Sequence, residues 1–359
     1  MKPLVFAYPG ELNTPTGGYI YDRRIIEGLQ KLGWQIELLS LGPGFPYPTK
    51  DTVARAAELL QQIPSEAIVV MDGLALGVLP EAVAELSERH IVVALIHHPL
   101  AFESGLSPEQ AHAFRLSEMC ALRYAKHVIV TGPSTARDLV QTFDVPSMRI
   151  DVVRPGTMRA PLAVGSGADT LHLLSVGSVT PRKGFDVLLA ALQPLADLPW
   201  TLSIAGDLTR DAGAPAQLQD DIVRFGFEGR VKTLGVVDDT QLETLYHDAD
   251  VFVLASFFEG YGMAYAEALA HGLPVIGTTG GAIPDTVPQD AGLLVPPGDV
   301  ESLTTALRRV MQDANLRARL SQGARQAATQ QPTWEESVNR LAEILTGLSD
   351  VNQSDLKQS

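Results

Sequence analysis

The sequence predicts an α/β fold made of two doubly wound, Rossmann-like domains facing a central cleft. Short β-branched apolar runs alternate with amphipathic segments of helical length, a pattern typical of parallel strands joined by crossover helices. The chain of 359 residues is 45% hydrophobic and exceeds the usual domain size of roughly 100 to 200 residues. The pattern occurs twice, on either side of a Gly-, Pro-, Ala- and Ser-rich segment at 155–169 that has no period.

In the first half, five apolar runs alternate with five segments of helical length. We expect strands at residues 4–8, 35–40, 67–71, 91–97 and 127–131. The segments between and after them predict helices at residues 19–32, 53–62, 80–88, 108–124 and 134–142.

The second half repeats this scheme. Its expected strands cover residues 171–177, 201–206, 231–234, 251–255 and 274–277, and its expected helices begin near Gly184, Ala216, Thr240, Ala264 and Ala282. A boundary near residue 165 gives an N-terminal acceptor-binding domain, 1–164, and a C-terminal donor-binding domain, 165–332. In the remaining segment, 333–359, a helix is expected at 334–348, and the last ten residues are polar and expected to be disordered.

The charge distribution argues against a nucleic-acid partner. The formal net charge is -15. Residues 1–160 hold 14 Lys and Arg against 17 Asp and Glu, whereas the rest holds 13 against 25, so the two parts carry -3 and -12. An acidic surface disfavours binding to a phosphate backbone, although a few cations and helix N-termini can still hold one small anion.

Cysteine usage and hydropathy suggest a compartment. The single cysteine, Cys120, cannot form an intrachain disulfide, and no apolar run approaches the roughly 20 residues of a membrane span. We therefore expect a cytoplasmic protein, with peripheral association at the inner membrane face left open.

The first motif is the glycine pair Gly17-Gly18, which follows the first strand and precedes a helix. Paired glycines let a backbone approach a ligand closely, and the helix N-terminus favours an anion. A tight turn without a ligand explains the pair equally well.

A second motif is the loop Gly177–Gly184, which contains Ser178, Arg182 and Lys183 before a helix. Two adjacent cations at a helix start repel each other and oppose the helix dipole. A diphosphate would supply the compensating anion; the alternative is a solvated basic turn.

The third motif is a pair of glutamates, Glu259 and Glu267, separated by seven residues. Glu259 lies in the loop after the strand at 251–255, and Glu267 lies about one turn into the next helix. Their carboxylates can accept hydrogen bonds from sugar hydroxyls, and backbone N–H groups nearby can hold phosphate oxygens. The donor-binding segment expected between the glutamates consists of Gly260, Tyr261, Gly262, Met263 and Ala264. Taken singly, Glu259 also fits a solvated loop charge and Glu267 a favourable helix-dipole position.

His97 and His98 end the strand that begins at Ile91. The carboxyl ends of parallel strands line the cleft where ligands of such sheets bind, so one of the two is a candidate catalytic residue.

Two other signals favour structural interpretations. Asp248-Ala249-Asp250 matches an Asp-x-Asp metal–nucleotide pattern, but it precedes a buried strand and is expected to end a helix. Cys120 lies on an expected helix among apolar and charged neighbours, where packing is favoured over nucleophilic catalysis. We therefore predict no metal site.

With these residues, the chain resembles the retaining GT-B glycosyltransferases of the family 4, or group 1, type. The resemblance is most specific in Gly177–Gly184, the segment 249–256, the pair Glu259 and Glu267, and the segment 272–276 with Gly280-Gly281. In the first half it rests on Gly17-Gly18, the strand-end histidines and the overall plan.

The resemblance implies a role for each matching residue. Arg182 and Lys183 would contact the donor diphosphate and stabilise the leaving nucleotide. Glu259 would hold hydroxyls of the transferred sugar, and Glu267 the ribose hydroxyls. Gly17 and Gly18 would close over the diphosphate. His97, favoured over His98 because it directly follows the apolar run, would lie near the reacting sugar.

The resemblance also implies a reaction. A hexose-type sugar would pass from a UDP- or GDP-sugar to a hydroxyl of a glycan, small-molecule or lipid acceptor by front-face displacement, with no metal or other cofactor. Alternatives are a nucleotide-sugar epimerase, a glycogen-type phosphorylase and a non-catalytic sugar-nucleotide-binding protein. The phosphorylase is disfavoured because the chain is short and has no convincing pyridoxal-phosphate lysine site.

Overall fold

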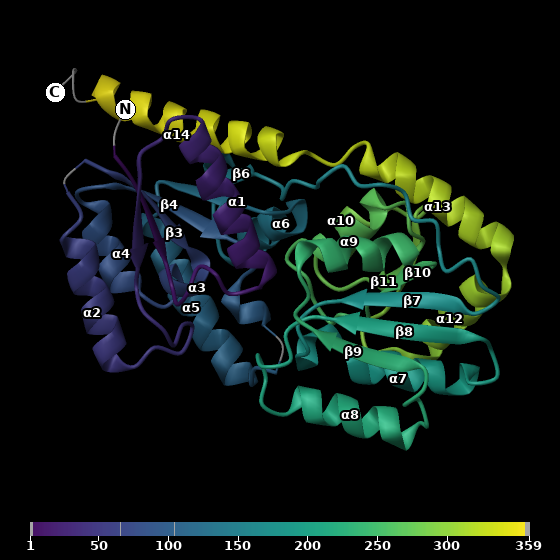
Figure 1. Cartoon of the computed structure of the whole chain (residues 1–359). Helices are drawn as coiled ribbons and strands as arrows, with labels where there is room; N and C mark the ends of the chain where they lie inside the picture. Colours follow the sequence, from purple (N-terminus) through teal and green to yellow (C-terminus); the bar gives the residue numbers. More distant parts are fainter. Residues whose placement is uncertain (1–2, 65, 104, 356–359) are drawn as a thin grey trace. The chain divides into compact units, whose positions relative to one another are not determined.

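The structure, a computed structural model, describes residues 3–64, 66–103 and 105–355. Its contacts divide the chain into two compact units (Figure 1). The first unit comprises the residues up to Gly156 together with those from Pro332 onward, and the second comprises Thr157–Gln331. The first unit thus ends before the expected boundary near residue 165, and the C-terminal segment belongs to it.

The position of the boundary has a local cause. Within the expected linker, the Ala163 N–H donates to the His271 carbonyl at 2.8 Å and the Val164 N–H donates to the His247 carbonyl at 2.9 Å, both in the second unit. On the other side, the backbone of Gly156 packs directly against that of Trp334. Most of the linker is therefore bound to the unit that follows it.

The first unit is built on a six-stranded parallel sheet of order β2-β1-β3-β4-β5-β6. Its strands are β1 (Leu4–Tyr8), β2 (Ile36–Ser40), β3 (Ile68–Asp72), β4 (Ile91–Ile96), β5 (His127–Val130) and β6 (Ile150–Val152). Its connecting helices are α1 (Gly17–Lys31), α2 (Lys50–Gln61), α3 (Gly73–Leu76), α4 (Pro80–Ser87), α5 (Pro108–Tyr124) and α6 (Pro133–Thr142). The sequence did not predict β6, because three half-buried residues give no periodic signal.

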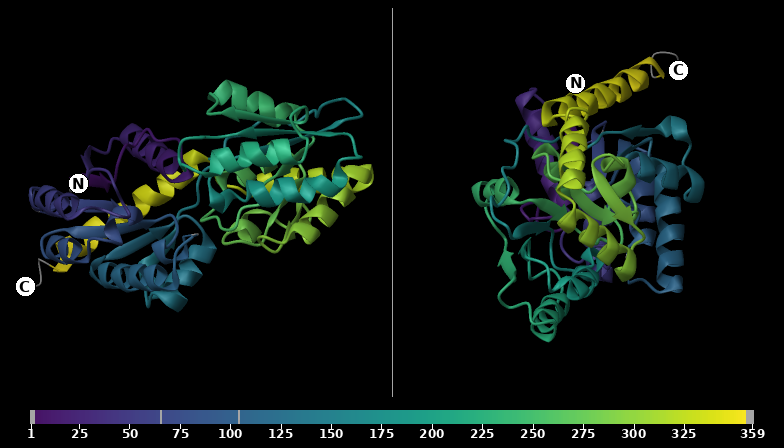
Figure 2. Two further views of the ribbon diagram at one scale, coloured as in Figure 1. Left: turned by 90° about the horizontal axis from the view of Figure 1, so that it is seen from below. Right: turned by 90° about the vertical axis from the view of Figure 1, so that its right-hand side faces the viewer.

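The two central strands, β3 and β4, are buried along their whole length. Successive side chains point to opposite faces, so Val69 and Met71 enter one apolar cluster while Ile68 and Val70 enter another. A sheet covered on both faces needs uninterrupted apolar strands, which is what the sequence shows at these positions. Figure 2 shows the helices that cover the faces of each sheet.

The second unit is built on another six-stranded parallel sheet, of order β12-β11-β10-β7-β8-β9. Its strands are β7 (Leu171–Val176), β8 (Trp200–Ala205), β9 (Val231–Gly235), β10 (Val251–Val253), β11 (Val275–Thr278) and β12 (Gly292–Val295). Its helices are α7 (Phe185–Leu192), α8 (Ala214–Arg224), α9 (Asp239–Asp248), α10 (Met263–Ala270), α11 (Ile283–Thr286), α12 (Val300–Gln312) and α13 (Ala314–Ala328). The two parallel sheets confirm the predicted α/β class.

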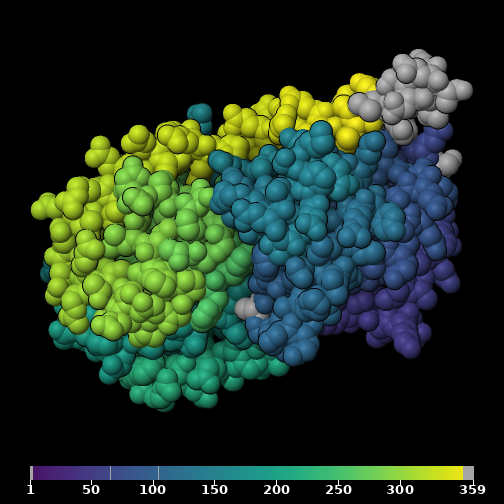
Figure 3. Space-filling view, turned by 180° about the vertical axis from the view of Figure 1, so that it is seen from behind, coloured from purple at the N-terminus to yellow at the C-terminus, as the bar shows by residue number. Residues whose placement is uncertain are grey.

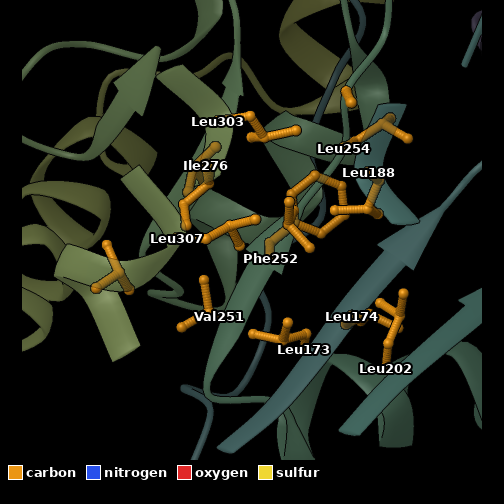
Figure 4. Close-up of a cluster of buried hydrophobic side chains, with 14 of the residues drawn as sticks. Leu173, Leu174, Leu188, Leu202, Val251, Phe252, Leu254, Ile276, Leu303 and Leu307 are labelled. Atoms are coloured by element: carbon orange, nitrogen blue, oxygen red, sulfur yellow. The ribbon is translucent and has the colours of Figure 1, made fainter. Parts of the chain in front are cut away.

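One large apolar cluster fills the second unit (Figure 4). Leu173 and Leu174 of β7 and Phe252 of β10 are buried at its centre, and Leu188 of α7 packs there as well. These strands carry the site loops at their carboxyl ends, so the core fixes the positions from which those loops start.

The chain ends in the helix α14 (Trp334–Asp355), which packs against α1 in the first unit. Atoms of this last helix are seen in yellow at the surface in Figure 3. Val338, Leu341 and Leu345 are buried in the same apolar cluster as Ile25 of α1, and Gly28 of α1 lies directly against Val338. The expectation that the last ten residues are disordered is wrong as far as Asp355, because the helix continues through that residue; residues 356–359 lie outside the described residues.

No helix in the described part of the chain combines the length and the apolar character needed to cross a bilayer.

Candidate functional site

The cation pair of the second unit lies in a short turn after β7. Arg182 and Lys183 end the 3-10 helix η3 (Pro181–Lys183), and Gly184 follows with a φ of 64°. A side chain at Gly184 would also collide with the carbonyl of Ala255, so only glycine fits there. Ser178 lies earlier in the same loop.

Both cations contact Glu259. The Arg182 guanidinium donates to Glu259 Oε2 at 3.1 Å and to the Phe258 carbonyl at 2.6 Å, and Lys183 Nζ donates to Glu259 Oε1 at 2.6 Å. The Ser256 hydroxyl donates to the same Oε1 at 2.6 Å. The structure thus brings together three residues that the sequence singled out and adds one, Ser256, that it did not.

Glu259 is buried, with 7% of its surface exposed. Burial alone would raise the pKa of its carboxyl, but the neighbouring charges of Lys183 and Arg182 and the hydrogen bonds from Lys183 and Ser256 outweigh it and lower the pKa to about 2. Glu259 is therefore an anion at neutral pH, and the two cations beside it leave a net positive charge.

The second glutamate, Glu267, lies on α10 and accepts a hydrogen bond from the Tyr246 hydroxyl at 2.9 Å. Tyr246 is 2% exposed, and its ring stacks on His271 with 4.9 Å between centroids. The helix starts at Met263, and its N-cap Gly262, with a φ of 86°, makes the turn from the loop. The hydrogen bond from buried Tyr246 thus helps to hold the Glu267 carboxylate in place.

The loop between the glutamates is tied to the segment after β11. The Ala282 N–H donates to the Glu259 carbonyl at 2.8 Å, and the Thr286 hydroxyl donates to the Tyr261 carbonyl at 2.5 Å. The predicted donor-binding residues Gly260, Met263 and Ala264 lie in this loop or directly after it. The hydrogen bonds to the segment after β11 therefore help to fix their backbone positions.

In the first unit, the structure distinguishes the two strand-end histidines. His97 Nε2 lies 3.1 Å from Asp22 Oδ1 and 3.6 Å from Asp72 Oδ2, and the ring lies against Gly18. His98 instead pairs with Glu103, with 3.0 Å between Nε2 and Oε2. Gly17 and Gly18 form the first turn of α1, whose N-cap is Thr16. Gly18 and the predicted His97 are therefore together, and His98 points to a different partner.

Besides Ser256, sequence reasoning missed Asp22, Asp72 and Tyr246. Asp22 is fully buried on the apolar face of α1, and Asp72 ends the otherwise apolar strand β3. In both cases the sequence offered one signal for a functional residue, namely an aspartate at a position where the pattern of buried residues predicts an apolar side chain. Tyr246 gave none, because an aromatic residue at that position fits the core equally well.

The Asp-x-Asp segment has the structural role that the sequence favoured. Asp250 accepts the N–H of His172 at 2.7 Å and that of Ser166 at 3.2 Å. Asp248 ends α9 beside His247, with 2.9 Å between the carboxylate and the imidazole. Asp250 thus joins the end of the linker to β7.

Comparison with known proteins identifies a family match within the second unit and relatives that match more of the chain. Residues 170–313 match the family model described as "Glycosyl transferases group 1". The D-inositol 3-phosphate glycosyltransferase of Saccharomonospora viridis is 30% identical over 262 residues, which cover 68% of this chain. The chain spans 60% of the length of that relative.

Solved structures resemble the whole fold. The sucrose-phosphate synthase of Thermosynechococcus elongatus matches with a TM-score of 0.82 and 20% identity, over 97% of this chain and 100% of that one. Anabaena Alr3699/HepE in complex with UDP-glucose matches with a TM-score of 0.73 and 20% identity, over 96% and 99%. At this identity the likeness establishes the fold, which is GT-B.

Proposed function

Because the chain belongs to the group 1 glycosyltransferase family, we propose that it transfers a hexose-type sugar from a nucleoside-diphosphate donor to an acceptor hydroxyl. The transfer retains the anomeric configuration and uses no metal. The observation that supports this most is the arrangement of Arg182 and Lys183 on either side of the Glu259 carboxylate.

The Glu259 carboxylate keeps one acceptor position for a sugar hydroxyl. A carboxylate offers about four acceptor positions. Arg182, Lys183 and Ser256 occupy three of them. The remaining position can accept a hydroxyl of the transferred sugar, and the cations keep the carboxylate ionised for that purpose.

The same two cations serve the leaving group. Glu259 neutralises one of their two charges, so the site retains about one positive charge for a diphosphate. As the bond from the anomeric carbon to the phosphate oxygen breaks, negative charge grows on that oxygen, and the cations stabilise it. The oxygen takes the proton of the acceptor hydroxyl while the new glycosidic bond forms on the same face of the sugar.

The remaining proposed roles belong to Glu267 and to three residues of the first unit. Glu267, held by Tyr246, accepts from the ribose hydroxyls of the nucleotide. Gly17, Gly18 and His97 act on the acceptor side, where His97 is already held against Gly18.

The acceptor class is proposed from the names of similar proteins. Two of them name a phosphorylated compound, namely D-inositol 3-phosphate and sucrose phosphate. One solved relative holds UDP-glucose. We therefore propose a UDP-sugar as donor ahead of a GDP-sugar, and a phosphorylated sugar or cyclitol as acceptor ahead of a glycan or lipid.

The test is a thermal-shift screen of UDP, GDP, ADP and their common sugar conjugates, without added metal. We expect stabilisation by one nucleotide class, because a ligand that binds only the folded state raises the melting temperature. Arg182→Ala and Glu267→Ala should lose this stabilisation, whereas Arg319→Ala, which removes an exposed cation on α13, should keep it.

Product analysis then separates the alternatives. Transfer to an acceptor with retention supports the proposal. Conversion of the sugar nucleotide without an acceptor would identify an epimerase, and binding with neither transfer nor donor hydrolysis would identify a sugar-nucleotide-binding protein. No stabilisation by any nucleotide at millimolar concentration would refute the donor site itself.

A further inference from the structure

Three titratable side chains meet at the carboxyl end of the first sheet. Asp22 comes from α1, Asp72 ends β3, and His97 follows β4. Their ligand-type atoms all lie within 4.8 Å of one another. The carboxylate side chains of Asp22 and Asp72 are 0% and 2% exposed, whereas the His97 side chain keeps 19% of its surface exposed. The cluster is thus closed on the carboxylate side and open at the imidazole.

One face of α1 packs against the imidazole ring of His97. Gly18, Tyr21 and Asp22 stand at helical spacings i, i+3 and i+4, and all three contact the ring. The Tyr21 ring meets it edge-on at 5.4 Å, while the Tyr21 hydroxyl donates to the Val153 carbonyl at 3.1 Å and so is engaged elsewhere. From β5, the Thr131 hydroxyl donates to the His97 carbonyl at 3.2 Å. The charged groups that face the ring are therefore Asp22 and Asp72.

The two carboxyl groups cannot both stay ionised at low cost. Asp22 Oδ2 is buried, and no hydrogen-bond donor reaches it from the described residues when both acids are ionised. Asp72 already accepts the Leu74 N–H at 2.7 Å through Oδ1. Burial and the charge of Asp22 raise the pKa of Asp72 to about 7. A proton on Asp72 would give Asp22 Oδ2 the donor that it otherwise lacks.

The His97 imidazole, in contrast, favours its charged form. Burial alone would lower the pKa of His97, but the charge and hydrogen bond of Asp22, with the charge of Asp72, outweigh it and raise the pKa above its usual value. The doubly protonated ring gives one N–H to Asp22 through Nε2. Within the described residues, no hydrogen bond occupies Nδ1.

We propose that Asp22 and Asp72 are positioning residues that share one proton and hold His97 as an imidazolium, whose Nδ1–H donates a hydrogen bond to the substrate. His97 then cannot serve as the base that removes the acceptor proton. This role rests on the proposed function, in which the leaving phosphate oxygen takes that proton. The charge state itself is a property of the first unit and does not depend on the reaction.

The first experiment measures the charge state without catalysis. The protein, labelled with ¹⁵N-histidine, is titrated by NMR, and His97 is assigned among the eight histidines by the signal that His97→Gln removes. We expect His97 to titrate above the ordinary value of about 6.5 in the wild type. In Asp22→Asn its titration should move down by about one pH unit or more, because the ring loses its ion pair.

Two further variants make the test specific. Asp72→Asn imitates the protonated acid, so it should shift the His97 titration less than Asp22→Asn does. Glu103→Gln removes the carboxylate beside His98 and should leave His97 unchanged. A neutral His97 ring at pH 7 in the wild type overturns the proposal, as does a larger shift in Asp72→Asn than in Asp22→Asn. His97 signals that move on chelator treatment and return with a divalent cation also overturn it, because they would assign the cluster to a metal.

The second experiment is the pH profile of transfer. The imidazolium is lost as pH rises through the raised pKa, so wild-type kcat should fall on the alkaline side, and Asp22→Asn should move that fall to lower pH. An alkaline limb unchanged in Asp22→Asn overturns the donor role of His97. If the nucleotide screen fails while His97 titrates as expected, the transferase proposal fails and the charge assignment stands.

Discussion

The two units build their candidate sites in opposite ways. In the second unit, the site comes from two continuous stretches, Gly177–Gly184 and 256–267, and each stretch is recognisable by itself. In the first unit, the corresponding cluster joins Asp22, Asp72 and His97, which the fold collects from one helix and two strand ends. The candidate site of the second unit can thus be recognised in local sequence, whereas that of the first unit forms only when the fold brings distant residues together.

The charge of the two sites differs as well. Two cations meet one carboxylate at Glu259, which leaves a positive excess suited to a diphosphate. In the first unit, two carboxyl groups meet one imidazole, which leaves no excess to attract an anion. Under the proposed function, this difference suits the second unit to charged groups and the first to neutral hydroxyls.

The largest expected effect tests the cation pair. Under the proposed function, Arg182→Ala removes a positive charge from the position where the leaving phosphate would become negative, and one such interaction is typically worth about 10²- to 10³-fold in kcat. Turnover at saturating donor should fall by that factor, while Arg319→Ala should stay near wild type. Equal turnover in both variants would show that the second unit does not grip the diphosphate through this pair.

A second prediction concerns stability at acid pH. The folded-state pKa of Glu259 is about 2, below its ordinary value of 4.5, so its stabilisation is present above pH 4.5 and is lost as pH falls toward 2. The total corresponds to about 3 kcal/mol. Urea unfolding of wild type and Glu259→Gln should give free energies of unfolding that differ most at pH 5.5 and converge as pH falls. A difference that does not change with pH would contradict the ion-pair origin of this stability.

The third prediction addresses the first unit, whose core depends on a distant segment. Gly28→Ala forces a methyl group against Val338 of α14, and such overpacking typically costs about 1 to 3 kcal/mol. The control is Gly347→Ala on α14, where a methyl group meets no atom within 4 Å and should stabilise the helix slightly. Thermal unfolding should rank Gly28→Ala below wild type and Gly347→Ala at or above it; the reverse order would argue against the packing of α14 on α1.

The smallest expected effect concerns Glu267. Tyr246→Phe removes the hydroxyl that holds its carboxylate and should weaken nucleotide binding about three- to tenfold, the usual worth of one hydrogen bond. Tyr124→Phe removes a comparable hydroxyl from an exposed residue and serves as the control. Calorimetric titration with the nucleotide that stabilises the wild type measures both. An unchanged dissociation constant in Tyr246→Phe would mean that Glu267 needs no support to bind the ribose.

The sequence predicted the strands whose signal is strong and local. β3, β4 and β7 are apolar runs bounded by polar or turn residues, and they appear within a residue or two of their expected positions. The helices α12 and α13 and the strands β6 and β12 were not predicted. For β12 and β6, four and three residues are too few to show a period.

The candidate residues of the second unit, which the structure brings into contact, could be selected from the sequence because they lie in continuous stretches. Arg182, Lys183 and Glu259 stand at strand ends, where parallel sheets place their ligands, and their charges are out of keeping with a plain loop. Asp22, Asp72 and Tyr246 were not predictable in the same way. Each acts through a partner at least 21 residues away in sequence, and no local pattern records which helix will face which strand.

The path of the chain also bears on how it is made. The chain leaves the first unit at Gly156 and returns to it only at Pro332, so all of the second unit emerges from the ribosome before α14 does. The second unit can close its core during synthesis, whereas Ile25 and its neighbours on α1 wait for Val338, Leu341 and Leu345. Domains usually fold in the order in which they are synthesised. The unit whose synthesis starts first therefore completes its core last, because the apolar face of α1 is covered only once α14 has been made.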